Sequence, residues 1–366
     1  MECQPVPQMS YAQFGERLNR RVFAERIPIS GSIELTFRCN LRCVHCYCNL
    51  PQSDQQAIET ELETEEVYRL LDQIAEAGCL WLLITGGEPF LRDDFLDIYT
   101  YAKKKGFITT LFTNGTLLTP AIADALVEWP PFLVEITLYG ATKETYERIT
   151  GIPGSFARCQ RGIDLLLERK IPLGLKTMAM TVNRAEIDQL QAYAEKLGVS
   201  FRFDPLVNQR LDGSEKPCRF RLSPEEAVNL EVTDEKRLKE WQALYDRSNG
   251  IFIDDRLFTC GAGISTFHID PYGRLSVCVM SRFASYDLRQ GLFEEGWSEF
   301  VPQLLRLKAE DAQKCSHCKF MAVCAQCPGW AWVETGHPGG IVEHLCQVAH
   351  LLGEVLDSNV LRKGVQ

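Results

Sequence analysis

The chain lacks a long apolar run, because its longest one, Cys79 to Ile84, is far too short to cross a bilayer. Its first twenty residues also lack the apolar centre that a signal peptide needs. Positive charge is scarce, since 39 Lys and Arg stand against 49 Asp and Glu, a formal net charge of -10. We therefore expect a cytoplasmic protein that binds neither a membrane nor a nucleic acid, because phosphate binding needs positive charge.

Cysteine, by contrast, is abundant, with 15 residues in a chain of 366. The reducing cytosol keeps cysteines as thiols, so dense clusters indicate metal or redox chemistry rather than disulfides. The densest stretch is "CNLRCVHCYC", residues 39–48, which holds four cysteines and a histidine. This stretch raises the question of what the thiols bind.

The rest of the pattern predicts an α/β fold, in which strand-like runs alternate with helix-like segments such as Thr64–Ala77 and Phe156–Glu168. Six strand–helix units indicate a parallel sheet or a partial barrel. After about residue 240, short strands, turn signals such as "DPYGR" and dense cysteines replace this pattern, so we expect a domain boundary there. The expected strands are Ser32–Phe37, Leu80–Thr85, Ile108–Phe112, Leu133–Leu138, Leu173–Ala179 and Phe201–Phe203.

Cys39, Cys43 and Cys46 follow the first expected strand with the spacing C-x3-C-x2-C. This places them at the carboxyl end of a barrel strand, where α/β barrels carry their active sites. Three thiolates can hold three irons of a [4Fe–4S] cluster and leave the fourth iron open to a small molecule. The alternative is a structural zinc site that recruits Cys48 or His45 as its fourth ligand.

The second expected strand runs directly into "GGEP", Gly86 to Pro89. Paired glycines let the backbone approach a ligand closely, and the Glu88 carboxylate can accept hydrogen bonds from an ammonium group. Taken alone, the same four residues are also typical of a tight turn at a strand end.

Together, C-x3-C-x2-C after the first strand and GGEP after the second resemble the radical S-adenosylmethionine (SAM) enzymes. That family has a partial (β/α)6, TIM-like barrel, which matches the six units expected here. The resemblance implies that the open iron binds SAM, whose reductive cleavage gives methionine and a 5′-deoxyadenosyl radical that abstracts hydrogen from a substrate. It implies Cys39, Cys43 and Cys46 as cluster ligands, and Gly86, Gly87 and Glu88 as contacts of the methionine amino group.

The resemblance also extends to three single residues. Thr137, after the fourth strand, matches the family's hydroxyl near the ribose and carboxylate of SAM, and Arg148 matches its carboxylate partner. A guanidinium can bind a carboxylate through two hydrogen bonds. Both residues are equally consistent with ordinary strand-end and helix-surface positions. His45 stands where the family usually has an aromatic residue beside the adenine.

Seven further cysteines follow in the last third of the chain, and their order resembles the SPASM extension of radical SAM enzymes. Gly273 has the expected place, with four residues between it and Cys278, whereas the interval from Cys324 to Cys327 is one residue shorter than usual. A zinc ribbon could use four of the seven but leaves three without a role. The seven are Cys260, Cys278, Cys315, Cys318, Cys324, Cys327 and Cys346.

The SPASM resemblance implies two auxiliary clusters, and therefore three [4Fe–4S] clusters in all. One would be held by Cys315, Cys318, Cys324 and Cys346, and the other by Cys260, Cys278 and Cys327. The second set lacks an obvious fourth thiolate; Asp254, Asp255, Cys218, the substrate or an open iron are the alternatives. Cys79 and Cys159 lie in apolar contexts and are expected in the core.

These resemblances imply an N-terminal extension at 1–28, a radical SAM barrel at 29–240 and a SPASM domain at 241–366. The SPASM extension is associated chiefly with peptide modification, so we expect a ribosomal-peptide (RiPP) maturase of oxidoreductase or lyase type. The alternatives are a sulfatase-maturing (formylglycine-forming) enzyme, a tetrapyrrole or other small-molecule cofactor maturase, and a non-enzymatic iron–sulfur electron carrier.

The expected partners are a precursor peptide or protein and an electron donor such as flavodoxin or ferredoxin. Many peptide maturases carry a leader-binding winged-helix domain ahead of the barrel, and the 31 residues before Ser32 are too few for one. A separate protein, or the barrel and SPASM surfaces, is therefore expected to recognise a leader.

Overall fold

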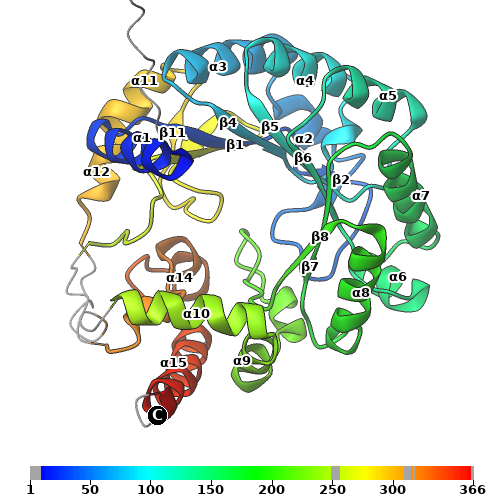
Figure 1. The fold of residues 1–366 in the computed structure, drawn as a ribbon. Helices are drawn as coiled ribbons and strands as arrows, with labels where there is room; N and C mark the ends of the chain where they lie inside the picture. The colour runs from blue at the N-terminus through cyan, green and yellow to red at the C-terminus, as the bar shows by residue number, and fades with distance from the viewer. Residues whose placement is uncertain (1–9, 249–255, 309–314, 316–317, 364–366) are drawn as a thin grey trace, which may run out of the picture.

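The computed structural model describes residues 10–248, 256–308, 315 and 318–363. Its centre is a nine-stranded sheet in the order β11-β10-β9-β1-β4-β5-β6-β7-β8 (Figure 1). Six of these strands are parallel neighbours and follow chain order, which confirms the expected α/β partial barrel. They are β1 (Ser30–Glu34), β4 (Trp81–Thr85), β5 (Ile108–Thr113), β6 (Leu133–Thr137), β7 (Leu173–Met178) and β8 (Ser200–Asp204).

Helices between the barrel strands cover the outer face of the curved sheet (Figure 1). They are α3 (Thr64–Glu76), α4 (Phe95–Lys104), α5 (Pro120–Glu128), α6 (Lys143–Thr150), α7 (Ser155–Glu168) and α8 (Ile187–Leu197). Helix α3 illustrates how the sequence forms and places these helices. It begins with a capping box between Glu63 and Glu66. Its buried residues recur with helical period, so one face packs on the sheet; they are Val67, Leu70, Leu71 and Ile74.

Alternate strand residues face opposite sides of the sheet. One set, including Ile33, Ile84 and Ile136, forms the apolar core beneath the helices. Cys79 and Cys159 are buried in the same core, which confirms the expectation for these two thiols. The other set faces the barrel interior and carries the polar side chains described below.

The C-terminal part of the chain extends the barrel sheet through β9 (Thr266–Ile269), β10 (Arg274–Ser276) and β11 (Tyr286–Asp287). Strand β9 pairs in parallel with β1, and Gly31 of β1 leaves room for the ring of Phe267, which an added Cβ would overlap. The expected "DPYGR" turn joins β9 to β10, with Gly273 at φ 80° donating to the Asp270 carbonyl at 3.1 Å.

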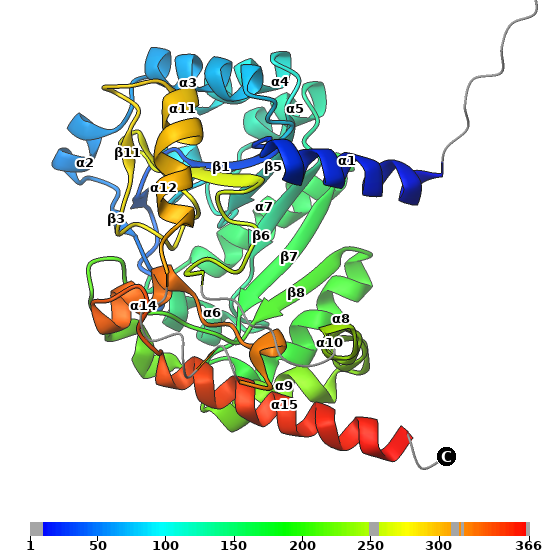
Figure 2. The ribbon, with the colours of Figure 1, turned by 90° about the vertical axis from the view of Figure 1, so that its left-hand side faces the viewer.

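The remaining C-terminal helices lie across the open side of the barrel, with α15 crossing near α9 and α10 (Figure 2). The expected domain boundary at residue 240 falls inside α10, so a division of the chain would lie at one end of this helix. The domain boundaries themselves remain predictions. These helices are α9 (Pro224–Thr233), α10 (Glu235–Ser248), α14 (Pro328–Thr335) and α15 (Glu343–Lys363).

The other α-helices and β-strands of the described residues are α1 (Tyr11–Glu25), α2 (Gln55–Thr60), α11 (Phe293–Glu295), α12 (Val301–Leu305), β2 (Arg38–Cys39) and β3 (Leu50–Pro51). Within the described ranges, the structure has no helix whose length and apolar character would let it cross a membrane.

Candidate functional site

The loop after β1 brings Cys39, Cys43 and Cys46 together, close enough for their thiols to interact electrostatically. Burial, and then the neighbouring charges of Cys46 and Cys39, raise the pKa of Cys43 well above its usual range. Burial likewise raises the pKa of Cys39 to about 12, and the charge of Glu88 adds to the effect. A bound cation would offset this cost by stabilising the thiolate forms.

Neighbouring residues shape this loop. The Cys48 thiol hydrogen-bonds to Cys46 and is the main cause that lowers the pKa of Cys46 to about 7. Arg210, from the segment after β8, donates to the Cys46 carbonyl at 3.0 Å and so fastens the loop to the far end of the sheet. The His45 ring lies edge-on to Tyr139 with centroids 4.9 Å apart, and its buried Nδ1 has no hydrogen-bond partner within the described part of the chain.

The GGEP segment packs directly on the backbone that leads from β1 to the cysteine loop. Gly87 donates its N–H to the Thr36 carbonyl at 2.6 Å, and Glu88 donates to the Arg38 carbonyl at 2.9 Å. An added Cβ at Gly86, where φ is +144°, or at Gly87 would come closer than 3.0 Å to a backbone carbonyl oxygen. Both glycines are therefore required because the chain's own backbone packs against them. The sequence analysis had explained them by the close approach of a ligand.

Gly87→Ala is expected to lower the free energy of unfolding by about 1–3 kcal/mol, because the backbone of residues 37–38 must move to admit the methyl group. The resemblance to radical SAM enzymes implies that a displacement of about 1 Å at this loop would also slow SAM cleavage, by roughly a hundredfold. Anaerobic denaturation and product analysis measure both effects.

Gly15→Ala in α1 is the matched control, since no described atom lies within 4 Å of its added Cβ. It should be neutral or stabilise the protein by up to about 1 kcal/mol, as expected for Gly to Ala inside a helix. Equal behaviour of the two variants would contradict the packing argument.

Glu88 is fully buried and joins the end of β4 to the end of β5. Its carboxylate accepts hydrogen bonds from the Thr113 hydroxyl at 2.8 Å, the Asn114 N–H at 2.8 Å and the Phe90 N–H at 3.2 Å. Burial raises the pKa of Glu88 to about 7 even though these hydrogen bonds oppose the rise. The Glu88 side chain thus holds the GGEP segment against the end of β5.

Thr137 and Arg148 occupy different settings. Thr137 ends β6, where its Cα partner on β7 is Lys176. Arg148 lies in the last turn of α6 and donates to the Val182 carbonyl at 2.7 Å, in the segment after β7. That contact orders the backbone beyond β7, and the expected pairing of Arg148 with a SAM carboxylate remains a prediction.

Sequence reasoning missed a buried polar network around Glu34, which is 0% exposed. Its carboxylate accepts from the Tyr47 hydroxyl at 2.6 Å and from Arg282 at 2.5 Å, and it lies 3.1 Å from Nε2 of His268. Nδ1 of His268 lies 2.8 Å from the Ser32 hydroxyl. The one available signal was a carboxylate inside an apolar strand, which demands buried partners. Tyr47 belongs to the cysteine loop and Arg282 follows Cys278, so one carboxylate holds both thiol-bearing segments.

The seven C-terminal cysteines lie in two groups. Burial raises the pKa of Cys278 to about 11, and the charges of Cys327 and Cys260 act on it as well. Burial also raises the pKa of Cys324 to about 11, and there the charges of Cys315, Cys318 and Cys346 contribute. The two sets of interacting thiols are Cys260, Cys278 and Cys327, and Cys315, Cys318, Cys324 and Cys346.

The three-thiol group has three protein candidates for a fourth ligand: Asp254, Asp255 and Cys218. Asp254 and Asp255 lie outside the described residues. Burial raises the pKa of Cys218, and its charged neighbours are Arg221, Glu334 and Glu215. Within the described ranges, no three or more His, Cys, Asp and Glu side chains converge closely enough to hold a single metal ion.

The fold and the cysteine loop define a class of protein: a partial α/β barrel with thiols at the carboxyl end of its first strand. Residues 33–196 match the model of the Radical SAM superfamily. The chain is 29% identical to an AdoMet-dependent heme synthase of Methanosarcina barkeri, covering 83% of this chain and 92% of the relative. It is 26% identical to the mycofactocin maturase MftC of Mycolicibacterium smegmatis, covering 88% of this chain and 81% of that protein.

The structure of Streptococcus suis SuiB bound to precursor peptide SuiA has a similar fold, with a TM-score of 0.68 and 15% identity. The match covers 95% of this chain and 84% of SuiB. Residues 33–196 therefore form a radical SAM domain, a fold that binds SAM and a [4Fe–4S] cluster, and the chain is similar to enzymes with this chemistry over most of its length. These similarities favour an enzyme over the alternative of a non-enzymatic electron carrier.

Proposed function

We propose that Cys39, Cys43 and Cys46 hold the SAM-binding [4Fe–4S] cluster. Three interacting thiols on one loop fit a cluster that keeps one iron free of protein ligands. When bound and reduced, this cluster and SAM supply the radical that abstracts hydrogen from a substrate. The chain's own part is to hold the loop in place, through Arg210 and the GGEP packing.

The SAM contacts are proposed at the strand ends around the same loop. Because the Glu88 carboxylate is engaged by protein donors, the backbone of Gly86 and Gly87 is the better candidate to meet the methionine ammonium. Thr137 and Arg148 are proposed for the ribose and carboxylate side. The His45 ring, whose buried Nδ1 has no hydrogen-bond partner among the described residues, is proposed to lie beside the adenine.

The C-terminal section, 241–366, is proposed to be a SPASM domain with two auxiliary clusters. The observation that carries this proposal is the division of its thiols into interacting sets of three and four. Four thiolates close a cluster to other ligands, whereas three leave one iron for another donor. Asp254, Asp255, Cys218 or the substrate remain the candidates for that position.

Anaerobic reconstitution is expected to load three [4Fe–4S] clusters, so about twelve irons and twelve sulfides per chain. Iron, sulfide and zinc analysis of the purified protein measures this content. Stoichiometric zinc together with only about four irons would overturn the SPASM proposal and leave the barrel assignment intact.

We further propose that the substrate is a peptide, so that the enzyme is a ribosomal-peptide maturase. The similarity to MftC over most of both chains supports this choice. A tetrapyrrole is the second candidate, because the heme synthase of Methanosarcina barkeri is similar over 83% of the chain. Leader recognition by a separate protein remains part of the peptide proposal.

Substrate-dependent formation of 5′-deoxyadenosine separates the two candidates. Short peptides encoded beside the gene and iron coproporphyrin are each incubated with the reduced holoenzyme and SAM, and products are analysed by mass spectrometry. The peptide proposal expects a mass change in a peptide and none in the tetrapyrrole. The reverse result would replace it with the tetrapyrrole function.

A further inference from the structure

Two cations inside the barrel share one carboxylate. Arg202 of β8 binds Glu135 of β6 through two hydrogen bonds, of 2.7 and 2.6 Å. Nζ of Lys176, on β7 between them, lies 3.6 Å from Oε2 of the same Glu135, which is longer than a hydrogen bond. One carboxylate therefore faces two positive charges, and the lysine ammonium is the less well satisfied of the two.

The surroundings of Lys176 make this arrangement costly unless something else binds there. Its side chain is only 15% exposed, and its ammonium lies 2.7 Å from the centroid of the Phe112 ring. An ammonium has three N–H donors, and leaving them without acceptors in a buried place is unfavourable. Burial lowers the pKa of Lys176 well below its usual range, despite the opposing effect of Glu135.

Arg202 remains accessible, because 53% of its side chain is exposed although its guanidinium is paired. The strand register places the two cations next to each other, since Lys176 is the Cα partner of both Arg202 and Thr137. The cation pair therefore lies beside the position proposed for SAM, on the interior wall that a substrate must approach.

We propose that Lys176 and Arg202 form a binding subsite for a carboxylate group of the substrate. The subsite rests on the proposed function, because it places the substrate beside the SAM-binding position. A carboxylate fits it by accepting from the ammonium and from the free edge of the guanidinium, with Glu135 keeping both cations aimed inward. The phenyl ring of Phe112 provides an apolar wall beside the charge.

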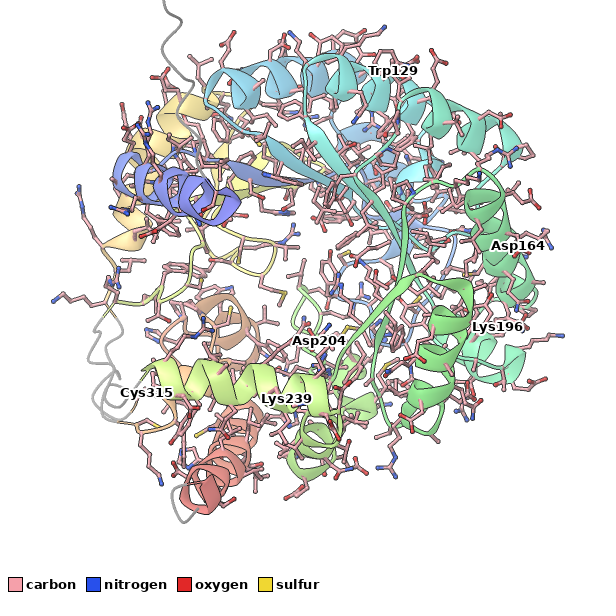
Figure 3. The ribbon with its side chains drawn as sticks, viewed as in Figure 1. Trp129, Asp164, Lys196, Asp204, Lys239 and Cys315 are labelled. Atoms are coloured by element: carbon pink, nitrogen blue, oxygen red, sulfur yellow. The ribbon has the colours of Figure 1, made fainter. Side chains whose placement is uncertain are left out.

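Asp204 limits where the carboxylate can sit. It is the next interior-facing residue of β8 after Arg202, and Figure 3 shows it toward the middle of the barrel. Its Oδ1 accepts from the Leu206 N–H at 2.9 Å, and burial raises its pKa. The ligand is therefore expected on the Lys176 side of Arg202, away from Asp204.

Ligand-observed fluorine NMR on the anaerobic, SAM-loaded holoenzyme tests the subsite with two probes, fluorophenylacetate and its neutral analogue fluorophenylacetamide. The carboxylate probe should bind and the amide should not. Lys176→Met and Arg202→Met should each weaken carboxylate binding by about tenfold or more, the loss expected when a hydrogen bond to a charged group is removed. Lys196→Met is the matched control, because Lys196 is exposed on α8 at the outside of the barrel (Figure 3).

Glu135→Gln gives a result of opposite sign. It removes the carboxylate that competes for both cations, so the carboxylate probe should bind about tenfold more tightly, whereas a purely structural ion pair would show no gain. Equal binding of the two probes, or unchanged binding in both methionine variants, would overturn the proposal. Equilibrium dialysis measures the affinity of the same variants for SAM. If Lys176→Met and Arg202→Met weaken SAM binding and leave probe binding unchanged, the two cations bind SAM and the proposal is wrong. SAM cleavage by the wild-type enzyme tests the proposed function separately.

Discussion

Replacing Cys39, Cys43 and Cys46 together with Ala is expected to remove about four irons per chain and all SAM cleavage. Without the three thiolates, the loop after β1 keeps only the Cys48 thiol and the His45 imidazole, which are too few ligands to hold the SAM-binding cluster. The auxiliary thiols lie in separate groups, so the other irons, about eight, should stay bound. Iron analysis and chromatography of 5′-deoxyadenosine measure the two effects.

A double variant, Cys79→Ala with Cys159→Ala, is the matched control because both thiols are buried in the apolar core. It should keep the full iron content and its SAM cleavage, with only the modest loss of stability typical of a small core truncation. Retention of all irons by the triple variant would contradict the ligand assignment. Loss of every iron would mean that the loop is needed for the fold of the whole chain.

Glu34→Gln is expected to lower the free energy of unfolding by about 3–5 kcal/mol, the range for removing one partner of a buried ion pair. The variant removes the carboxylate that accepts from Arg282 and lies beside His268, and it leaves Arg282 with only the more distant Asp270 carboxylate, at 3.6 Å. Because Glu34 also binds Tyr47, the cysteine loop and the segment after Cys278 should both become more mobile. Anaerobic denaturation gives the stability, and hydrogen exchange reports on the two segments.

The pH dependence has a definite sign. Burial acts to raise the pKa of Glu34, but the charges and hydrogen bonds of His268, Arg282 and Tyr47 prevail and lower it from 4.5 to about 2. A carboxyl whose pKa is lowered by folding stabilises the protein above its unfolded value, and this stabilisation is lost as the pH falls through the folded value. The Glu34 contribution is therefore complete above about pH 4.5 and disappears toward pH 2.

Glu59→Gln removes the same charge from an exposed position on α2 and should change stability by no more than about 0.5 kcal/mol. If Glu34→Gln unfolds no earlier than this control, the buried network does not stabilise the fold.

The six barrel strands could be predicted because each is a short apolar run between helical segments. The end of the first strand could not. The sequence "SIELTF" favours a strand to Phe37, but β1 ends at Glu34, because the carbonyls of Thr36 and Arg38 pair with the GGEP segment instead. That exchange of partners joins residues about fifty positions apart, which local pattern does not reveal.

The thiols of the loop after β1 could be anticipated from their close spacing, whereas the grouping of the C-terminal thiols came from the resemblance, since Cys327 lies 67 positions after Cys260. The Glu34 network could not, because it joins the first strand to Arg282, 248 positions later. The shared carboxylate of Glu135 likewise depends on strand order, since Lys176 and Arg202 meet it only once β6, β7 and β8 are neighbours. Charges at such positions look like solvated residues until the sheet places them inside the barrel.

Reductive cleavage of SAM by the anaerobically reconstituted protein tests the central claim most directly. With dithionite and SAM, the protein with its full iron and sulfide content should form methionine and 5′-deoxyadenosine in equal amounts. The same protein leaving SAM intact under these conditions would contradict the account.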